Sequence, residues 1–386
     1  MRQPIERTSI HLLQIMVVNV AAISFFNLSP VILGALVDER GFSYQQIGWL
    51  AGLFMLGLAG VNTVWGLAQP RVSRHKMSRI GSLLAIICFA GGAHVTDFLP
   101  FALLLTGAGI GCGLCFGLAI TCLGEDAFPE SKFGYMQALQ TLTAALGLFM
   151  LPLSATTPLG ISGNGMLLCT VLMLAAFFSS SSLRASSQPF DEIQHATPKS
   201  NWLFWVACII LLLNVAAEAS VWSFIERIGV SNEIANPTVA QILAASFFAA
   251  GFGSIAGGVL GIRYGRLLPF LSAVSLSILA VIIFWWSSSL VGYVIAVMLF
   301  SAAWNFGACY RMGLAIAADE TGHRAPLIPA AQTLGAAIGP AIGGSLIFDG
   351  RFSGLYSMAI ILWMITVILF YSVNKRLNIR NNPSAL

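Results

Sequence analysis

The stretch "LQTLTAALG" at residues 139–147 is repeated as "AQTLGAAIG" at residues 331–339, with six of the nine positions identical. The two copies begin 192 residues apart in a chain of 386 residues, so their separation is close to half of the chain's length. Alanine- and glycine-rich helices can match by accident, so this pair needs support from other parts of the sequence.

Two further pairs of segments repeat at nearly the same separation. "NVAA" occurs at 19–22 and again at 214–217, and "GLAQPRVSR" at 66–74 is similar to "GVLGIRYGR" at 258–266. Three repeats in one order along the chain predict an internal duplication, with each copy forming one structural unit.

The composition indicates an integral membrane protein. Hydrophobic residues make up 57% of the chain and charged residues 9%, whereas soluble domains contain roughly 25% charged residues. A soluble fold has too little interior for so much apolar surface, so lipid must solvate much of it. The net charge of +4 is small and scattered, and we expect no nucleic-acid partner.

The cysteines and short motifs indicate neither a disulfide framework nor a cofactor. The seven cysteines all fall within apolar runs, and their number is odd. Cys112 and Cys115 form a C-x-x-C, but no second pair or histidine stands beside them. The chain contains no G-x-x-x-x-G-K-[ST] nucleotide-binding motif. We therefore expect no metal, no cofactor and no nucleotide-driven transport.

The charge-free intervals predict twelve transmembrane helices, since one helix needs about 20 apolar residues to cross the hydrocarbon. The intervals run between residues 7 and 38, 40 and 71, 79 and 97, 97 and 125, 132 and 184 (two helices, broken at 155–165), 199 and about 222, 233 and 263, 266 and 311 (two helices, broken at 287–289), 324 and 349, and 351 and 375.

The distribution of Lys and Arg predicts the orientation, because short positively charged loops stay in the cytoplasm. With the N-terminus inside, Arg40, Arg227 and Arg351 fall in outer loops and Arg311 within a span, while the remaining residues of the 19 Lys and Arg fall in cytoplasmic segments. We expect a multi-pass protein of the cytoplasmic (inner) membrane with both termini inside. The first apolar run lacks a small-residue cleavage site, which favours a retained helix.

The longest cytoplasmic segment divides the predicted helices into two sets of six. We expect an N-terminal six-helix bundle over 1–183, a cytoplasmic linker over 184–200 and a C-terminal six-helix bundle over 201–386. The repeated stretch then falls in the fifth helix of each bundle.

The loops after the second and eighth predicted helices resemble a motif of the major facilitator superfamily, G-x-x-x-D-R-x-G-R-[KR]. Pro70 and Ile262 stand at its acidic position. The positions that match the motif are Gly66, Arg71 and Arg74 in the first loop, and Gly258, Arg263, Gly265 and Arg266 in the second.

This resemblance implies an all-α membrane fold of twelve helices in two pseudo-symmetric six-helix bundles. It also implies loops that latch the two halves together, although simple positive-inside anchoring explains the same charges. The segment "RYGR" predicts a turn of four residues at most, in which Gly265 supplies unusual backbone angles. Arginines in such loops can bind helix carbonyls and lipid phosphates.

Glu218 is the one carboxylate that falls within a predicted apolar span. A charge at mid-span costs about 2.5–3.5 kcal/mol on insertion scales, so such residues usually face a cavity or a partner. The superfamily resemblance implies that helices 1, 4, 7 and 10 line a central cavity, which makes Glu218 a proton-coupling candidate. A position near the outer end of the helix, within reach of water, or a structural salt bridge are the alternatives.

Arg311 falls in the tenth predicted helix, about two turns before its cytoplasmic end. It can bind an anionic substrate or extend to the inner surface, with the second reading slightly favoured. Counting from the predicted helix centres places Glu218 and Arg311 at depths that differ by roughly 20 Å, so we expect no direct pair between them.

Amide and aromatic side chains supply the other candidates for the substrate cavity, because buried amides need partners that a substrate can provide. Glycines at small-x-x-x-small spacing in the fourth predicted helix indicate close helix packing. The further cavity candidates are Asn19, Asn27, Gln140, Asn214, Trp222, Trp304, Asn305 and Gln332.

These features together predict a secondary active transporter that moves a small organic solute by alternating access, with proton coupling. We expect a monomer whose partners are the solute, protons and the lipid bilayer. The alternatives are a drug or metabolite exporter of the same fold, a facilitative uniporter, or a transporter-like sensor or scaffold. "FALLLTGAGIG" at 101–111 lacks the arginine that drug–proton antiporters of the superfamily carry in helix 4. The five histidines lie in loops or at span edges, so the sequence does not indicate an enzyme.

Overall fold

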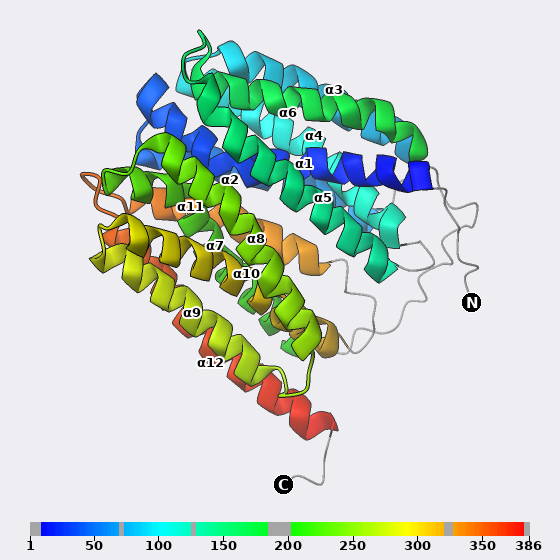
Figure 1. The fold of residues 1–386 in the computed structure, drawn as a ribbon. Coiled ribbons are helices and arrows are strands. Elements are labelled where there is room, and N and C mark those ends of the chain that lie inside the picture. Colours follow the sequence, from blue (N-terminus) through cyan, green and yellow to red (C-terminus); the bar gives the residue numbers. More distant parts are fainter. Residues whose placement is uncertain (1–8, 69–72, 125–128, 184–201, 320–326, 382–386) are drawn as a thin grey trace. The chain divides into compact units, whose positions relative to one another are not determined.

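The computed structural model is almost entirely α-helical and describes residues 9–68, 73–124, 129–183, 202–319 and 327–381. These residues form twelve α-helices and two short 3-10 helices (Figure 1). The α-helices are α1 (Ser9–Arg40), α2 (Tyr44–Ala68), α3 (Arg74–His94), α4 (Phe98–Gly124), α5 (Pro129–Met150), α6 (Gly160–Ser179), α7 (Trp202–Ser231), α8 (Asn236–Leu260), α9 (Leu267–Trp286), α10 (Leu290–Ala318), α11 (Leu327–Ser345) and α12 (Ser353–Asn381).

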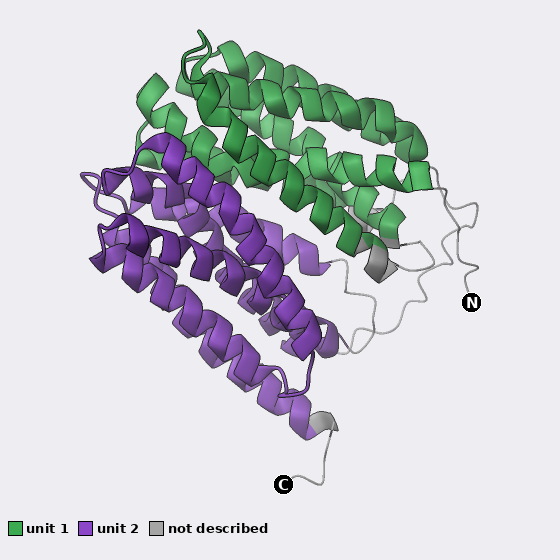
Figure 2. Ribbon diagram, in the orientation of Figure 1, with its two compact units in different colours: residues 1–195 green, residues 196–386 purple. Residues whose placement is uncertain are grey.

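The chain divides into two compact units, residues 1–195 and residues 196–386 (Figure 2). The first unit contains α1 to α6 and the second contains α7 to α12. The linker expected over 184–200 lies outside the described residues, so the predicted domain limits stay a prediction.

The two units repeat the same helix pairings. In the first unit α1 packs on α5 and α6, α2 packs on α4, and α3 packs on α4 and α6. In the second unit α7 packs on α11 and α12, α8 packs on α10, and α9 packs on α10 and α12. Each of these pairings in one unit has its equivalent in the other, as expected from an internal duplication.

Most of the helices can cross a membrane by length and composition. Within the described residues eleven helices meet this condition, and α11, which has 19 residues, is not among them. Large apolar side chains also face outward along the helices, as Phe248, Phe252, Ile255 and Val259 do on α8. Lipid is the solvent that suits such surfaces.

The glycines of α4 let it pack closely on two neighbouring helices. A Cβ placed on Gly113 would lie 2.7 Å from the carbonyl oxygen of Leu58 in α2. On another face of α4, a Cβ on Gly107 would lie 2.8 Å from Sγ of Cys88 in α3. The close packing predicted from the small-x-x-x-small spacing is therefore confirmed.

Helix α7 is longer than the sequence predicts, because it continues past Trp222 to Ser231. Arg227, which the sequence places in an outer loop, lies within the helix and is buried, as is the neighbouring Glu226. The carboxylate of Glu226 accepts hydrogen bonds from Nε of Arg227 at 2.5 Å and from Nη2 at 2.7 Å. The two charges offset each other, so they do not end the helix. Glu218 is thus not the one carboxylate within a span.

Arg40 was also expected in an outer loop, but it is the last residue of α1. Its guanidinium donates hydrogen bonds to the backbone carbonyls of Gly92, Ala93 and Val95, where α3 ends. The neighbouring Glu39 accepts hydrogen bonds from the backbone N–H groups of residues 161 and 162, at the start of α6. One end of α1 thereby holds the ends of two other helices, with a charge sign that suits each end.

The connection between α8 and α9 comprises residues 261–266, so the prediction of a turn of four residues at most is wrong. Helix α8 ends one residue before Gly261, which has a φ of 51° and caps it. Gly265 has a φ of 70°, so the prediction of an unusual backbone conformation at Gly265 is confirmed.

Candidate functional site

Two stripes of candidate residues face each other within the second unit. Asn214, Glu218 and Trp222 are spaced four residues apart on α7 and therefore share one face of that helix. Trp304 and Arg311 are seven residues apart on α10, which also places them on one face. Hydrogen bonds from Arg311 to Asn214 and Glu218 show that these two faces meet.

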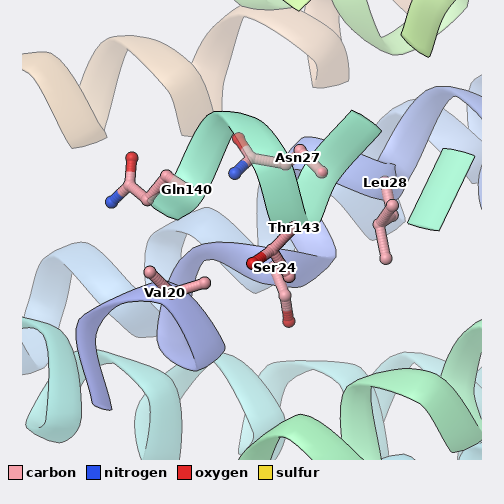
Figure 3. Close-up of a pocket in the computed structure, with 7 residues that line it drawn as sticks. Val20, Ser24, Asn27, Leu28, Gln140 and Thr143 are labelled. Carbon is pink, nitrogen blue, oxygen red and sulfur yellow. The ribbon is translucent and has the colours of Figure 1, made fainter. Parts of the chain in front are cut away.

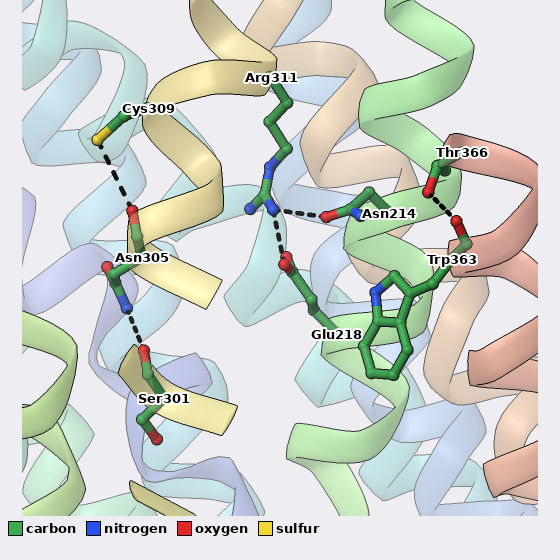
Figure 4. A network of polar contacts seen from close by, with 8 residues as sticks. All are labelled: Asn214, Glu218, Ser301, Asn305, Cys309, Arg311, Trp363 and Thr366. Carbon is green, nitrogen blue, oxygen red and sulfur yellow. Dashed lines mark hydrogen bonds and ion pairs between the residues drawn. The ribbon is translucent and has the colours of Figure 1, made fainter. Parts of the chain in front are cut away.

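Arg311 joins the two helices through a buried ion pair (Figure 4). Its Nη1 donates to Oε1 of Glu218 at 2.6 Å and to Oδ1 of Asn214 at 2.5 Å. Glu218 and Arg311 are each only 2% exposed. The expectation that these two residues do not pair is wrong, and so are the readings in which Glu218 reaches water and Arg311 extends to the surface.

The true length of α7 explains this error. A helix that ended near residue 222 would place Glu218 at its outer end, whereas Glu218 lies near the middle of the 30-residue α7. Side chains on a helix lean toward its N-terminus, so Arg311 extends back toward the middle of α10. In agreement, a Cβ placed on Gly307 would lie 3.8 Å from Nη1 of Arg311. The long arginine side chain covers the remaining difference in depth.

The ion pair leaves two polar atoms without a hydrogen bond. Among the described residues, Oε2 of Glu218 and Nε of Arg311 are both buried without a partner. Buried polar groups are usually satisfied, and those that are not often lie at functional sites. Glu218 therefore has an acceptor available for a proton, and Arg311 has a donor available for a ligand.

Aromatic side chains continue the site along α7 and α10. The rings of Trp222 and Trp304 are nearly perpendicular, at 87°, with centroids 6.4 Å apart. Trp222 also contacts Phe247 of α8, and Trp304 contacts Phe300 of its own helix. One end of the facing stripes is therefore charged, and the other end is apolar and aromatic.

The remaining candidates of the second unit do not join this cluster. The side chain of Asn305 donates to the carbonyl oxygen of Ser301 at 3.2 Å, on another face of α10 from Arg311 (Figure 4). Gln332 is half-buried on α11. Within the described residues, neither Asn305 nor Gln332 forms a hydrogen bond with Glu218 or Arg311.

The first unit brings together Asn19 and Gln140. Nε2 of Gln140 donates to Oδ1 of Asn19 at 2.6 Å, which joins α5 to α1. Gln140 also lines a hollow of about 190 Å³, a volume that includes its part open to solvent (Figure 3). Its lining residues are Val20, Ser24, Asn27 and Leu28 of α1 with Gln140, Thr143 and Ala144 of α5.

The sequence did not single out Ser24 and Thr143 of this hollow. Small hydroxyl residues are common in membrane helices, where they bond their own backbone, as Ser24 does to the carbonyl oxygen of Ala21 at 2.8 Å. The one available signal is the difference between the two copies of the repeat, which have Thr143 and Gly335 at equivalent positions.

The loop-motif residues are only partly described. Arg71 lies outside the described residues, and the structure describes Gly66 only as part of α2. Arg74 begins α3, and its guanidinium lies 3.8 Å from Sγ of Cys122. In the second loop Arg263 is exposed and Arg266 is half-buried, while Gly258 belongs to α8. The proposed latching role stays a prediction.

The part of the chain that the structure describes contains no group of three or more His, Cys, Asp and Glu residues that could hold a metal ion. The charged cluster on α7 and α10 consists of one carboxylate, one guanidinium and one amide. Such a set can bind a charged or polar solute and can exchange a proton.

Comparisons with known proteins agree with this fold. The chain is 12% identical to a mutant of the nucleoside transporter NupG, whose crystal structure matches with a TM-score of 0.73 over 94% of this chain and 98% of that chain. It is 10% identical to tetrameric PepTSo2, with a TM-score of 0.72 over 97% of this chain and 99% of that chain. At these identities the likeness concerns the fold alone.

One curated relative shares part of the sequence. It is NiaP of Bacillus subtilis (strain 168), a protein named for niacin/nicotinamide transport, which is 26% identical over 117 residues. The match covers 29% of this chain and 28% of the relative's length.

The family model described as Major Facilitator Superfamily matches residues 15–325, which is most of the chain. The main helix pairings of this chain repeat in its two units, and the proteins to which it is related are membrane transporters rather than enzymes. The chain is therefore a multi-pass membrane transporter that belongs to the major facilitator superfamily.

Proposed function

We propose that this transporter moves a small organic solute by proton-coupled secondary transport through alternating access. The observation that carries the proposal is the buried pair of Glu218 and Arg311 at the middle of α7. A carboxylate held in an apolar unit is costly, so its presence favours a functional role. A proton added at Glu218 would neutralise it and release its hold on Arg311, and this links protonation to a change in the site.

The same proposal includes orientation and assembly. The protein acts as a monomer in the cytoplasmic membrane, with both termini in the cytoplasm. The concentration of Lys and Arg in the segments assigned to that side supports this orientation. In the second unit, Trp222 and Trp304 are proposed to contact the solute, since they lie on the same faces of α7 and α10 as Glu218 and Arg311. In the first unit, Asn27 and Gln140 stay candidates for the cavity.

Proteoliposomes that contain a pH-sensitive dye test the proposal. Purified protein is screened with organic acids, amphipathic cations, sugars, nucleosides, niacin and nicotinamide, the last three chosen because the relatives are named for them. Wild-type protein is expected to show a proton flux with one class of compound. The Glu218→Gln variant is expected to lose this flux, because Gln cannot take up a proton.

The control is Glu233→Gln, which removes an exposed carboxylate just beyond α7. It is expected to leave the proton flux unchanged. Substrate movement without any proton flux would instead indicate a facilitative uniporter. Failure of every compound class to undergo counterflow would support the sensor or scaffold and contradict transport.

A further inference from the structure

The cluster of Arg311, Glu218 and Asn214 carries no net charge, but its two charged members differ in how they can change. Glu218 can be neutralised by one proton. Arg311 stays protonated under all conditions that a protein meets. Any ligand that enters the cluster must therefore leave Arg311 with a partner, because a buried charge without one is strongly destabilising.

This difference decides between a cationic and an anionic ligand. A cation that paired with Glu218 would displace Arg311 and leave its guanidinium with Asn214 alone. An anion that paired with Arg311 would displace Glu218, and a proton on Glu218 would then remove the excess charge. The second exchange ends with a neutral buried site, and the first does not.

The unpartnered atoms fit the anionic exchange. Nε of Arg311 is buried and donates no hydrogen bond, so the guanidinium has a free donor for an incoming acceptor. Oε2 of Glu218 is buried and accepts none, so it has a free position for a proton. Planar carboxylates match the donor geometry of a guanidinium especially well, since two parallel hydrogen bonds can form.

In the part of the chain that the structure describes, no other charged side chain forms an ion pair with Glu218, and Glu226 and Arg227 of α7 pair with each other. Of the helices that pack on α7, α8 and α11 contain no titratable side chain. The other two contribute Tyr293, Cys309 and Tyr310 on α10, besides Arg311, and Tyr356, Tyr371, Lys375 and Arg376 among the described side chains of α12. Arg311 is the one that an ion pair joins to Glu218 in the described part of the chain.

The neighbouring aromatic side chains indicate the body of the ligand. Trp222 follows Glu218 by four residues, or about one turn, and its ring meets that of Trp304 at a centroid distance of 6.4 Å. Phe247 and Phe300 extend this apolar surface. Such surroundings suit an apolar or aromatic group rather than a multiply charged phosphate.

We infer that the site takes a small organic monocarboxylate with an apolar body, which binds Arg311 in place of Glu218 while Glu218 takes up one proton. The inference rests on the proposed transport function and names its substrate class. Because ligand and proton occupy the site together, the two move in the same direction, as in symport. No bond is made or broken apart from the transfer of this proton from solvent to Oε2.

Calorimetry on the purified full chain, in two buffers of different ionisation enthalpy, counts the protons taken up on binding. Two matched sets of probes share a body and differ in charge. One set is benzoate, benzamide and benzylammonium, and the other is hexanoate, hexanamide and hexylammonium. The expected result is that a carboxylate binds at least about tenfold more tightly than its amide and ammonium analogues, with about one proton taken up per ligand.

Variants distinguish the contribution of Glu218 from that of Arg311. Glu218→Gln resembles the protonated acid, so it should bind the carboxylate at least as tightly as wild type with no proton uptake. Arg311→Gln should weaken carboxylate binding at least about tenfold. Arg351→Gln, which removes an exposed arginine outside the site, should change neither quantity. If Arg311→Gln does not fold, the loss of proton uptake in Glu218→Gln still carries the test.

Several outcomes would overturn the inference. These are tighter binding of an amide or ammonium probe, carboxylate binding without proton uptake in wild type, and no carboxylate binding in either set. Counterflow in liposomes then distinguishes this inference from the proposed function. Carboxylate binding with proton uptake but without counterflow would contradict transport alone, and counterflow of an amide or ammonium probe would contradict the substrate class alone.

Discussion

At the scale of single residues, Glu218 and Arg311 depend on each other for their place in an apolar unit. Each is almost fully buried, and each provides the other's opposite charge at 2.6 Å. Removing one partner from a buried pair typically costs about 3–5 kcal/mol, because the other charge remains. Glu218 can be neutralised by a proton and Arg311 cannot. This difference should therefore also appear in the stability of variants that lack one of the two residues.

Arg311→Gln and Glu218→Gln are expected to lower the unfolding temperature in detergent by different amounts as the pH changes. The loss in Arg311→Gln should shrink as the pH falls, because a proton can neutralise the unpaired Glu218. The loss in Glu218→Gln should stay constant over the pH range in which Glu218 of the wild type remains ionised, because Arg311 cannot lose its charge. Thermal unfolding across a pH series measures both.

The double variant Glu218→Gln/Arg311→Gln is the control for this comparison, because it contains neither charge. It should be more stable than the sum of the two single losses predicts. Equal pH dependence in the two single variants would show that the pair is not the source of the destabilisation.

At the scale of helices, the two copies of the repeated stretch pack differently. In α11, Gly335 and Gly339 stand against the backbone of α7, where an added Cβ would collide with the carbonyl oxygens of Leu212 and Ala216. In α5, the position equivalent to Gly335 is Thr143, which lines the hollow between α5 and α1. The threonine therefore lies beside an open space in the first unit, and the equivalent glycine lies at a close helix contact in the second.

Gly339→Ala should separate α11 from α7, because its Cβ has no space beside Ala216. Overpacking of this kind typically costs about 1–3 kcal/mol, measured here as a lower unfolding temperature in detergent. Gly251→Ala on α8 is the matched control, since a Cβ there meets no atom within 4 Å. Equal unfolding temperatures for the two variants would contradict the close packing of α11 on α7.

The sequence predicts helices and their pairing better than it predicts contacts between side chains. Charge-free intervals locate the twelve helices because charges avoid lipid, and the repeat indicates which helices are equivalent. The same rule fails at Glu226 and Arg227, because two adjacent charges that neutralise each other do not end a helix. Because the predicted helix ends too early, its middle is placed too close to its N-terminus. The contact between Glu218 and Arg311 was missed as a consequence. The helical period predicts which residues share one face of a helix. The depth of a residue in the membrane can be predicted only when the true ends of its helix are known.

At the scale of the whole molecule, α11 decides how many times the chain crosses the membrane. It is rich in glycine, alanine and proline, and it falls outside the eleven helices that are apolar enough by composition. Its buried residues include Gly335, Ala336, Gly339 and Pro340, so α7 covers much of it in place of lipid. A helix shielded in this way can cross the membrane with less apolar character than one that lipid surrounds.

If α11 crosses, the number of crossings is even, and the C-terminus lies on the same side as the N-terminus. Fusions of a cytoplasm-active reporter and a periplasm-active reporter to the C-terminus should therefore show activity of the cytoplasmic reporter alone. A fusion at residue 350, in the connection between α11 and α12, should give the opposite pattern. A C-terminus on the outer side would mean that α11 does not cross, and the equivalence of α5 and α11 in the two units would then hold for helix packing but not for membrane topology.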